Sequence, residues 1–412
     1  MTDIVLDAQS TTTEQLGHSV HVTVSGLASN REWFYAFELD GIRSPIGRSI
    51  TVGPAQSRRI ILASCQHYED GFFGAWRRAT EEFADLVVHV GDSIYTRDGV
   101  GESVRTHGSP TPRTLDDYRR RYSLYRSDPD LQAAHASLPW CAVWDDNEFV
   151  SNFAGGVADR DSERVIAAHQ AWWEHNPVRG GAPVIGEPLL IDRSISFDGL
   201  ADVWLLDGRQ YRSGQVCDRL SGLPAVERCA AVDDASRTML GQRQEDVLTE
   251  GLASHGGRWQ LIAQQTVMAD FAINVGDDTG INNDQWDGYA AARDRLLRSI
   301  GEARTIVLSG DIHAAAINDL EFEGTVVAHE IVAPSVTSKI DPVVALGLSF
   351  TVGALPNVRY FNTSTHGYVV VDITNDSITA MFRDVTTAST PGRVTSGPTA
   401  AVSAGRQLTV DR

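Results

Sequence analysis

The stretch that decides the fold is Ala84-Asp85-Leu86-Val87-Val88-His89-Val90-Gly91-Asp92-Ser93-Ile94-Tyr95. Its apolar, β-branched run stops at Gly91, and this pattern predicts a buried strand that ends in a tight turn. A carboxylate, Asp92, follows the turn directly, and the phenol of Tyr95 comes three residues later. Because ligands of open α/β sheets bind beyond the carboxyl ends of the strands, we expect the chemistry of this protein at Asp92 and Tyr95.

Three further apolar runs end in polar side chains of a similar kind. The run 59–65 ends in the thiol of Cys65, the run 140–148 in Asp145-Asp146-Asn147-Glu148, and the run 304–313 in Asp311 and His313. Four strand ends that carry carboxylates, a thiol, a phenol, an amide and an imidazole are most economically explained by a metal site. This mixture suits a trivalent iron beside a harder divalent cation.

The composition of the 412-residue chain, 42% apolar and 22% charged, is that of an ordinary soluble globular protein. A net charge of -19 argues against a nucleic-acid-binding surface, but small phosphate esters remain possible because bound metals can neutralise their charge. No apolar run is long enough for a transmembrane helix. Residues 1–7 show no leader sequence, so we expect a cytoplasmic protein, or the mature form of a secreted or cell-envelope protein. Cys217 and Cys229 could pair in an exported protein, and two free thiols fit the sequence equally well.

The order of the predicted elements indicates an α/β fold of stacked sheets flanked by helices. Residues 1–55 form a short β-rich module, with alternation at 21–24, a strand at 33–39 and a hairpin turn at Asp40-Gly41. The main domain spans residues 56–412 and begins with a βαβ unit whose helix lies at 70–83. Further helices are expected at 115–125, 128–137, 160–175, 239–253 and 289–300. Further strands are expected at 189–197, 202–207, 259–263, 304–311, 325–333, 367–373 and 377–382.

Several sequence blocks resemble, in order, the signature blocks of the PhoD-like alkaline phosphatase/phosphodiesterase family. They are Ala63-Ser64-Cys65-Gln66, Gly91-Asp92-Ser93-Ile94-Tyr95, Trp144-Asp145-Asp146-Asn147-Glu148 with Asn152, Leu206-Asp207-Gly208-Arg209-Gln210-Tyr211 and Ser309-Gly310-Asp311-Ile312-His313. The resemblance covers roughly residues 20 to 375 and implies a metallophosphoesterase with a purple-acid-phosphatase-like fold. It also implies a ferric ion and calcium, in a two-metal or three-metal centre, and an N-terminal β-sandwich domain that is truncated here.

The resemblance further implies roles for individual residues. It places Cys65, Asp92, Tyr95 and His313 around iron, and it makes Asp92 a bridge to calcium, with Asp311, Asn152 and Asp146 as further calcium ligands. Small phosphomonoesters or phosphodiesters would then be hydrolysed by attack of a metal-bound hydroxide. Arg105 and His107, in a loop after Tyr95, could contact the substrate phosphate.

Other polar residues are expected to have structural roles. We expect Asp145 to accept a hydrogen bond near the metals rather than to bind one. An ion pair between Asp207 and Arg209 would hold a strand end. The arginines at 119–121 and 126 are expected to form a solvated helix face.

Asn147 departs from the family pattern, which usually reads Trp-Asp-Asp-His-Glu. The imidazole of that His is expected to approach the phosphate and to protonate the leaving group, whereas an amide cannot supply a proton. Two alternatives therefore stay open beside an ordinary phosphatase. One is a specialised phosphodiesterase, phospholipase-type or biosynthetic hydrolase, and the other is a catalytically weak protein that captures a phosphorylated ligand.

Overall fold

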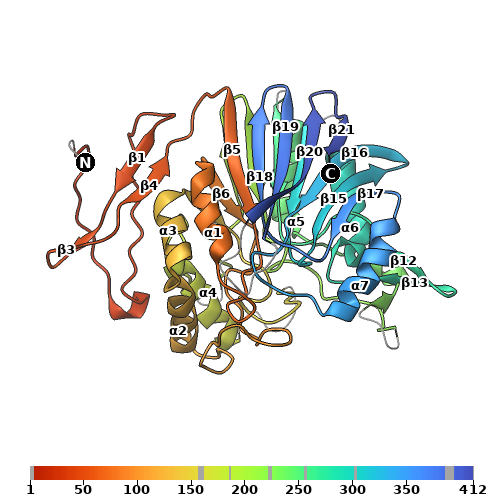
Figure 1. Ribbon diagram of the computed structural model, residues 1–412, viewed down its shortest axis with the longest axis horizontal. Coiled ribbons are helices and arrows are strands. Elements are labelled where there is room, and N and C mark those ends of the chain that lie inside the picture. The colour runs from red at the N-terminus through yellow and green to blue at the C-terminus, as the bar shows by residue number, and fades with distance from the viewer. Residues whose placement is uncertain are drawn as a thin grey trace.

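The computed structural model describes residues 4–155, 162–184, 187–220, 225–254, 258–300, 304–385 and 394–411. Two stacked seven-stranded sheets form the centre of this described part (Figure 1). The first sheet has the order β21 (Leu408–Asp411), β20 (Val394–Ser403), β19 (Ser377–Val385), β18 (His366–Thr374), β5 (Ser57–Ala63), β6 (Leu86–His89) and β7 (Trp140–Ala142). The second has the order β17 (Val358–Asn362), β15 (Ala315–Phe322), β16 (Thr325–Val332), β14 (Arg304–Ser309), β11 (Trp259–Ala263), β9 (Ala201–Leu205) and β8 (Arg193–Ser196).

Helices lie to either side of the two sheets (Figure 1). On the side of the first sheet are α1 (Gly74–Ala79), α2 (Leu115–Arg126), α3 (Pro129–Ser137) and α4 (Glu163–His175), and on the other side are α5 (Gln242–Ala253), α6 (Ala290–Ile300) and α7 (Pro342–Thr351). The predicted start of α3 is confirmed, because Asp128 caps its N-terminus and Pro129 is its first residue. The stacked α/β fold is confirmed, although residues 160 and 161 of one predicted helix lie outside the described residues.

The parallel strands of both sheets end at a common edge. In the first sheet β5, β6 and β7 run parallel, and in the second β9, β11, β14 and β16 do. The predicted βαβ unit is thus confirmed, as β5 and β6 flank α1. Just past the ends of β5 and β16, a parallel bridge between Ser64 and Ser335 joins the two sheets. The loops that follow these strands are therefore brought together, and they carry the candidate ligands.

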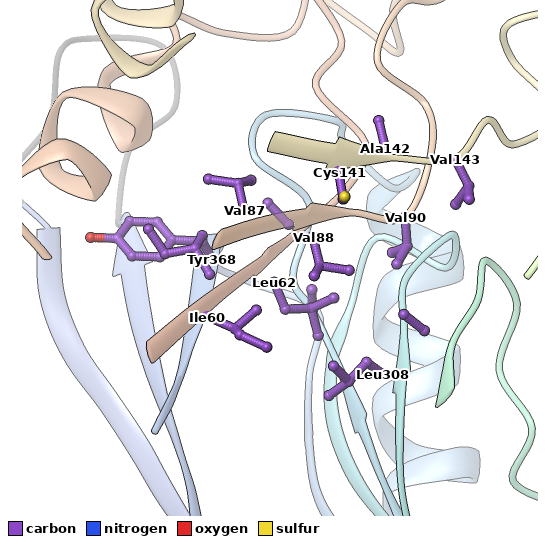
Figure 2. Packing of buried hydrophobic residues seen from close by; sticks show 14 of the residues in the cluster. Ile60, Leu62, Val87, Val88, Val90, Cys141, Ala142, Val143, Leu308 and Tyr368 are labelled. Atoms are coloured by element: carbon purple, nitrogen blue, oxygen red, sulfur yellow. The ribbon is translucent and has the colours of Figure 1, made fainter. Parts of the chain in front are cut away.

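Apolar side chains from the facing sheets form the main core. Ile60 and Leu62 of β5, Val88 of β6 and Leu308 of β14 are fully buried there (Figure 2). A second cluster packs α5 and α6 on the outer face of the second sheet. Close packing on both of its faces holds the second sheet rigidly, and so positions the loops that follow its strands.

The first 55 residues form two small antiparallel pairs. Strand β1 (Glu32–Tyr35) pairs with β4 (Gly47–Ile50), and β2 (Glu38–Leu39) pairs with β3 (Ile42–Arg43) through the predicted turn at Asp40-Gly41. The expected strand at 33–39 is thus two strands, interrupted at residues 36 and 37. The alternation at 21–24 is not a strand: no described strand pairs with it, and the His21 ring instead stacks on Trp173 at 4.0 Å.

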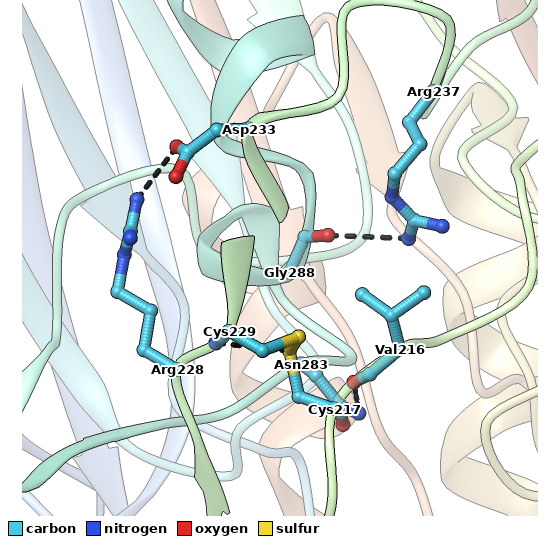
Figure 3. The surroundings of a disulfide bond; sticks show 8 residues. All are labelled: Val216, Cys217, Arg228, Cys229, Asp233, Arg237, Asn283 and Gly288. Carbon is cyan, nitrogen blue, oxygen red and sulfur yellow. Dashed lines mark hydrogen bonds and ion pairs between the residues drawn. A yellow bond between two sulfur atoms is a disulfide. The ribbon is translucent and has the colours of Figure 1, made fainter. Parts of the chain in front are cut away.

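Cys217 and Cys229 form a disulfide with Cα atoms 5.5 Å apart (Figure 3). It lies beside a small sheet of β10 (Val226–Glu227), β13 (Asp278–Ile281) and β12 (Ile273–Val275). Next to the disulfide, the Val216 carbonyl accepts a hydrogen bond from Asn283 Nδ2 at 2.6 Å. The disulfide thus joins the segments around Cys217 and Cys229, and the hydrogen bond attaches the chain before Cys217 to the loop that follows β13.

The arginines of α2 do not form a single solvated face, contrary to expectation. Arg121 is buried and donates to the carbonyls of Tyr95 and Pro110, while Arg119 pairs with Glu174 at 2.6 Å. A buried guanidinium is tolerated here because backbone carbonyls accept its N–H groups. Through the whole described chain, none of the helices combines the length and the apolar character that a membrane crossing requires.

Candidate metal centre

Three candidate ligands meet from three parallel strands. Cys65 follows β5, Asp92 follows β6 and His313 follows β14, and their ligand atoms lie within 4.8 Å of one another. Cys65 and Asp92 are fully buried. The structure thus brings together three of the four residues that the resemblance assigned to iron.

The backbone at the candidate ligands is strained. Cys65 and Asp92 both have φ of 59°, Asn152 has 59°, His313 has 57° and Asp311 has 65°. Such left-handed values are uncommon outside glycine and persist only where the surroundings enforce them. Their concentration at these positions supports a functional site.

Tyr95 joins this group through its hydroxyl. The Tyr95 hydroxyl donates to Asp92 Oδ2 at 2.6 Å, lies 3.0 Å from His313 Nε2 and accepts from Ser338 Oγ at 2.8 Å. His313 Nδ1 lies 3.1 Å from the Lys339 carbonyl, so Nδ1 carries the proton and the Nε2 lone pair faces Tyr95. Burial and the Asp92 charge raise the pKa of Tyr95. The Tyr95 phenol would therefore ionise only if a bound cation stabilised the phenolate.

A second donor group shares Asp92. One carboxylate oxygen each of Asp92, Asp145, Asp146 and Asp311 lies within 4.8 Å of the others. Burial raises the pKa of Asp92 and Asp145, and it raises that of Asp311 to about 6. Among the described residues, buried Asp145 Oδ2 has no hydrogen-bond partner. Crowded, desolvated carboxylates with an unsatisfied oxygen fit hard cations, so this group suits the divalent metal.

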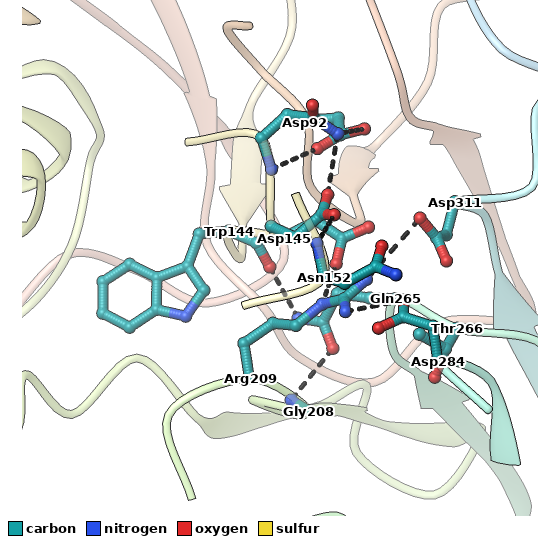
Figure 4. A network of polar contacts seen from close by, with 12 residues as sticks. Asp92, Trp144, Asp145, Asn152, Gly208, Arg209, Gln265, Thr266, Asp284 and Asp311 are labelled. Carbon is teal, nitrogen blue, oxygen red and sulfur yellow. Dashed lines mark hydrogen bonds and ion pairs between the residues drawn. The ribbon is translucent and has the colours of Figure 1, made fainter. Parts of the chain in front are cut away.

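The guanidinium of Arg209 lies among these acidic side chains (Figure 4). It pairs with Asp145, with Asp284 at 2.9 Å and with Asp311 at 3.5 Å. The expected ion pair with Asp207 is wrong, because Asp207 instead accepts the backbone N–H of Arg209 at 2.9 Å. The expectation for Asp145 stays a prediction: it accepts from Arg209, and it also belongs to the acidic group.

Two further residues of this network were missed from the sequence. Asp284 holds Arg209 and Arg212, and Gln285 donates to Asp311 Oδ2 at 2.5 Å. Both belong to the polar run Asn282-Asn283-Asp284-Gln285, which directly follows β13. A polar run directly after a strand is the sequence pattern that could have predicted these two residues.

Glu148 binds the two loops that carry Asp92 and Asp145. Its carboxylate accepts the backbone N–H groups of Asp92 at 3.1 Å, Ser93 at 2.7 Å and Asp145 at 3.0 Å. Gly91 permits this close approach, since a Cβ there would lie 2.6 Å from Asp145 N. The two strand ends are therefore locked together by backbone contacts.

Asn147 links two of the carboxylates. Its Nδ2 donates to Asp92 Oδ2 at 3.0 Å and to Asp146 Oδ1 at 2.7 Å, and its Oδ1 accepts from Arg97 Nε at 3.1 Å. Arg97 was also missed from the sequence, although it lies two residues after Tyr95. Asn152 donates its backbone N–H to Asp146, and Figure 4 shows its side chain in the same cluster.

Gln215 connects Asn152 to the disulfide-bonded segment. Its Nε2 donates to the Asn152 carbonyl at 2.7 Å and to Asp284 Oδ1 at 2.9 Å. Because Gln215 lies two residues before Cys217, the disulfide indirectly steadies a candidate calcium ligand.

Arg105 and His107 make other contacts than those expected. Arg105 pairs with Asp128 at 2.7 Å and stacks 3.8 Å over the Tyr68 ring, so it braces the start of α3. His107 Nε2 lies 3.1 Å from the Tyr125 hydroxyl, and burial lowers the His107 pKa to about 4. These contacts favour structural roles for both residues.

Comparisons with known proteins identify the family and the fold of this chain. A family model described as PhoD-like phosphatase matches residues 60–382, and one for the N-terminal domain of PhoD-like phosphatases matches residues 1–53. Alkaline phosphatase D of Bacillus subtilis (strain 168) is 33% identical over 414 residues, covering 92% of this chain and 68% of that protein. A solved structure of PhoD is similar with a TM-score of 0.86 and 30% identity, over 96% of this chain and 80% of that chain. The purple acid phosphatase PPD1 from yellow lupin (Lupinus luteus) seeds shares the fold, with a TM-score of 0.56 and 12% identity over 92% and 61% of the two chains.

Proposed function

The chain belongs to the PhoD-like phosphatase family and is a metal-dependent phosphoesterase, and from this premise we propose that it hydrolyses small phosphate esters with ferric iron and calcium. The observation that carries the proposal is the pair of donor groups that share Asp92, each with its ligand atoms within 4.8 Å. A shared carboxylate is the arrangement that holds two cations close together.

The donor chemistry divides the ligands between the two metals. Cys65, Asp92, Tyr95 and His313 would hold the ferric ion, since a thiolate and a phenolate stabilise the trivalent state. Asp92, Asp146, Asn152 and Asp311 would hold calcium through oxygen atoms. Bound cations supply Lewis acidity, offsetting charge on the phosphoryl group and lowering the pKa of water.

The remaining residues of the site hold these ligands in place. Glu148 fixes the Asp92 and Asp145 loops, and Arg209 limits the repulsion among the acidic residues. Asn147 restrains Asp92 and Asp146 by donating to both. An amide does not titrate in this range, so Asn147 orients groups and transfers no proton.

The Asn at position 147 also supports a second candidate, a protein that captures a phosphorylated ligand and turns it over slowly. The Cys217–Cys229 disulfide favours an oxidising compartment, and hence an exported protein over a cytoplasmic one. We also propose that residues 1–55 form a separate β-rich module and that residues 56–412 form the catalytic domain.

The test combines elemental analysis with a substrate panel. We expect iron and calcium in the purified protein and hydrolysis of aryl phosphates. We also expect a visible absorption band that arises from charge transfer from the Tyr95 phenolate to ferric iron. The variant Tyr95→Phe should lose the band, and retention of both colour and iron would remove Tyr95 from the ligand set. A protein that binds phosphate but hydrolyses neither monoesters nor diesters would establish the capture function instead.

A further inference from the structure

We propose that Arg97 binds the phosphoryl oxygens of the substrate and that Asn147 positions its guanidinium for this contact. The inference rests on the proposed phosphoesterase function and deepens it by naming a residue that touches the phosphate. Its basis is the hydrogen bond between Arg97 and Asn147 beside the candidate ligands.

The orientation of the Asn147 amide is set by its neighbours. Its nitrogen lies 3.0 Å from Asp92 Oδ2 and 2.7 Å from Asp146 Oδ1. An ionised carboxylate accepts hydrogen bonds and has none to donate. A flipped amide would place its oxygen against both carboxylates, so the carbonyl must face the other way. There it accepts from Arg97 Nε at 3.1 Å.

Arg97 differs from the other two arginines considered for this site. Arg105 and Arg209 are paired with carboxylates, whereas Arg97 forms no ion pair with any carboxylate in the described part of the chain. The half-buried Arg97 guanidinium lies 5.1 Å from the centroid of the Tyr95 ring, and its Nη1 donates to the Asp98 carbonyl at 3.3 Å. No hydrogen bond to another described residue involves its Nη2.

This placement suits an anion. The guanidinium is always charged and presents its N–H groups as a planar fork, which matches two oxygens of a phosphate. The side-chain amide of Asn147 bridges the guanidinium to Asp92 and Asp146. The positive charge therefore lies near two carboxylates whose negative charges would otherwise repel the substrate. Contact with the Tyr95 ring and the bond to Asn147 restrict the side chain before a ligand arrives, which reduces the entropy lost on binding.

The experiment compares Arg97→Gln, Arg97→Lys and the wild-type protein, with Arg78→Gln as the matched control. Arg78 lies on α1 and pairs with Glu81, away from the candidate ligands. Steady-state kinetics on an aryl phosphate, calorimetric binding of inorganic phosphate, and iron and calcium content are measured for each. We expect Arg97→Gln to weaken phosphate binding and raise KM about tenfold to a hundredfold, as for loss of a charged hydrogen bond. Its metal content should be unchanged, and Arg97→Lys should restore part of the affinity.

The possible failures are distinguishable. Wild-type protein that neither binds phosphate nor hydrolyses esters would overturn the proposed function together with this inference. Wild-type activity with unchanged phosphate affinity in Arg97→Gln would overturn only the role of Arg97. Loss of metal in Arg97→Gln would assign Arg97 to assembly of the centre, and it too would overturn the inference.

Discussion

The side-chain nitrogen of Asn147 donates a hydrogen bond to Oδ2 of Asp92, the residue that the two donor groups share, across 3.0 Å. The same nitrogen also reaches Asp146, and the amide oxygen faces Arg97. Asn147 is therefore fully occupied in orienting its neighbours. This relationship gives the first prediction.

Replacing Asn147 by His should change which esters the enzyme hydrolyses well. Without a proton donor at this position, aryl phosphates should be good substrates and alkyl monoesters slow ones. A general acid contributes about a hundredfold to ten-thousandfold, and most where the leaving group is basic. Asn147→His should therefore raise alkyl-ester turnover more than aryl-ester turnover, measured as kcat/KM over a leaving-group series. A shallow dependence on leaving-group pKa in the wild-type protein would instead show that another donor is present.

Substitution of Asp92 should be far more damaging than substitution of Asp145. Asp92 belongs to both donor groups, so Asp92→Asn should reduce both iron and calcium and lower kcat by several orders of magnitude. Asp145→Asn should cost roughly tenfold to a hundredfold, because Arg209 keeps its pairs with Asp284 and Asp311. Elemental analysis and kinetics on both variants provide the measurement. Equal losses would mean that Asp145 binds metal directly.

Gly91 and Gly101 form a matched pair for testing the close approach of the two strand ends. Both have positive φ, 108° and 73°, but only at Gly91 would a Cβ collide with Asp145. Gly101→Ala should cost about 1 kcal/mol from backbone strain alone. Gly91→Ala should cost about 3 to 5 kcal/mol and should lower metal content. Denaturant unfolding of the two variants decides the matter, and similar losses would argue against the collision.

His175 should make folding stability fall at acid pH. Burial lowers its pKa from 6.5 to about 4, opposed by a hydrogen bond to the Ala171 carbonyl and reinforced by the Arg126 charge. The unfolded chain binds the proton more readily between pH 4 and 6.5, so stability should rise with pH across this window. The full difference corresponds to about 3 kcal/mol.

The variant His175→Phe keeps an aromatic ring against Tyr122 but cannot titrate. Its unfolding free energy, measured from pH 4 to 7, should lack the His175 contribution, so the wild-type curve should be steeper. Parallel curves for the two proteins would show that the folded-state pKa of His175 is not lowered.

Sequence alone determined the strand ends and the side chains that they present. Apolar runs ending at Gly91 and Gly310 identify the strands before Asp92 and Asp311, because burial on both faces of a sheet leaves a local signature. The resemblance to known signature blocks then selected Cys65, Tyr95 and His313, which the structure brings together. These features are local in the chain, and local patterns are what a sequence displays directly.

Only the tertiary structure decided how distant residues complete the site. Arg209 contacts Asp284 across 75 positions of sequence, and nothing in either segment specifies the other. Arg97 and Arg105 lie in the same loop but have different partners. Arg97 donates a hydrogen bond to Asn147, whereas Arg105 donates one to Asp128. Long-range pairing depends on how the two sheets and their loops pack in three dimensions. For that reason residue types were predictable from the sequence, whereas the partner of each buried charge was not.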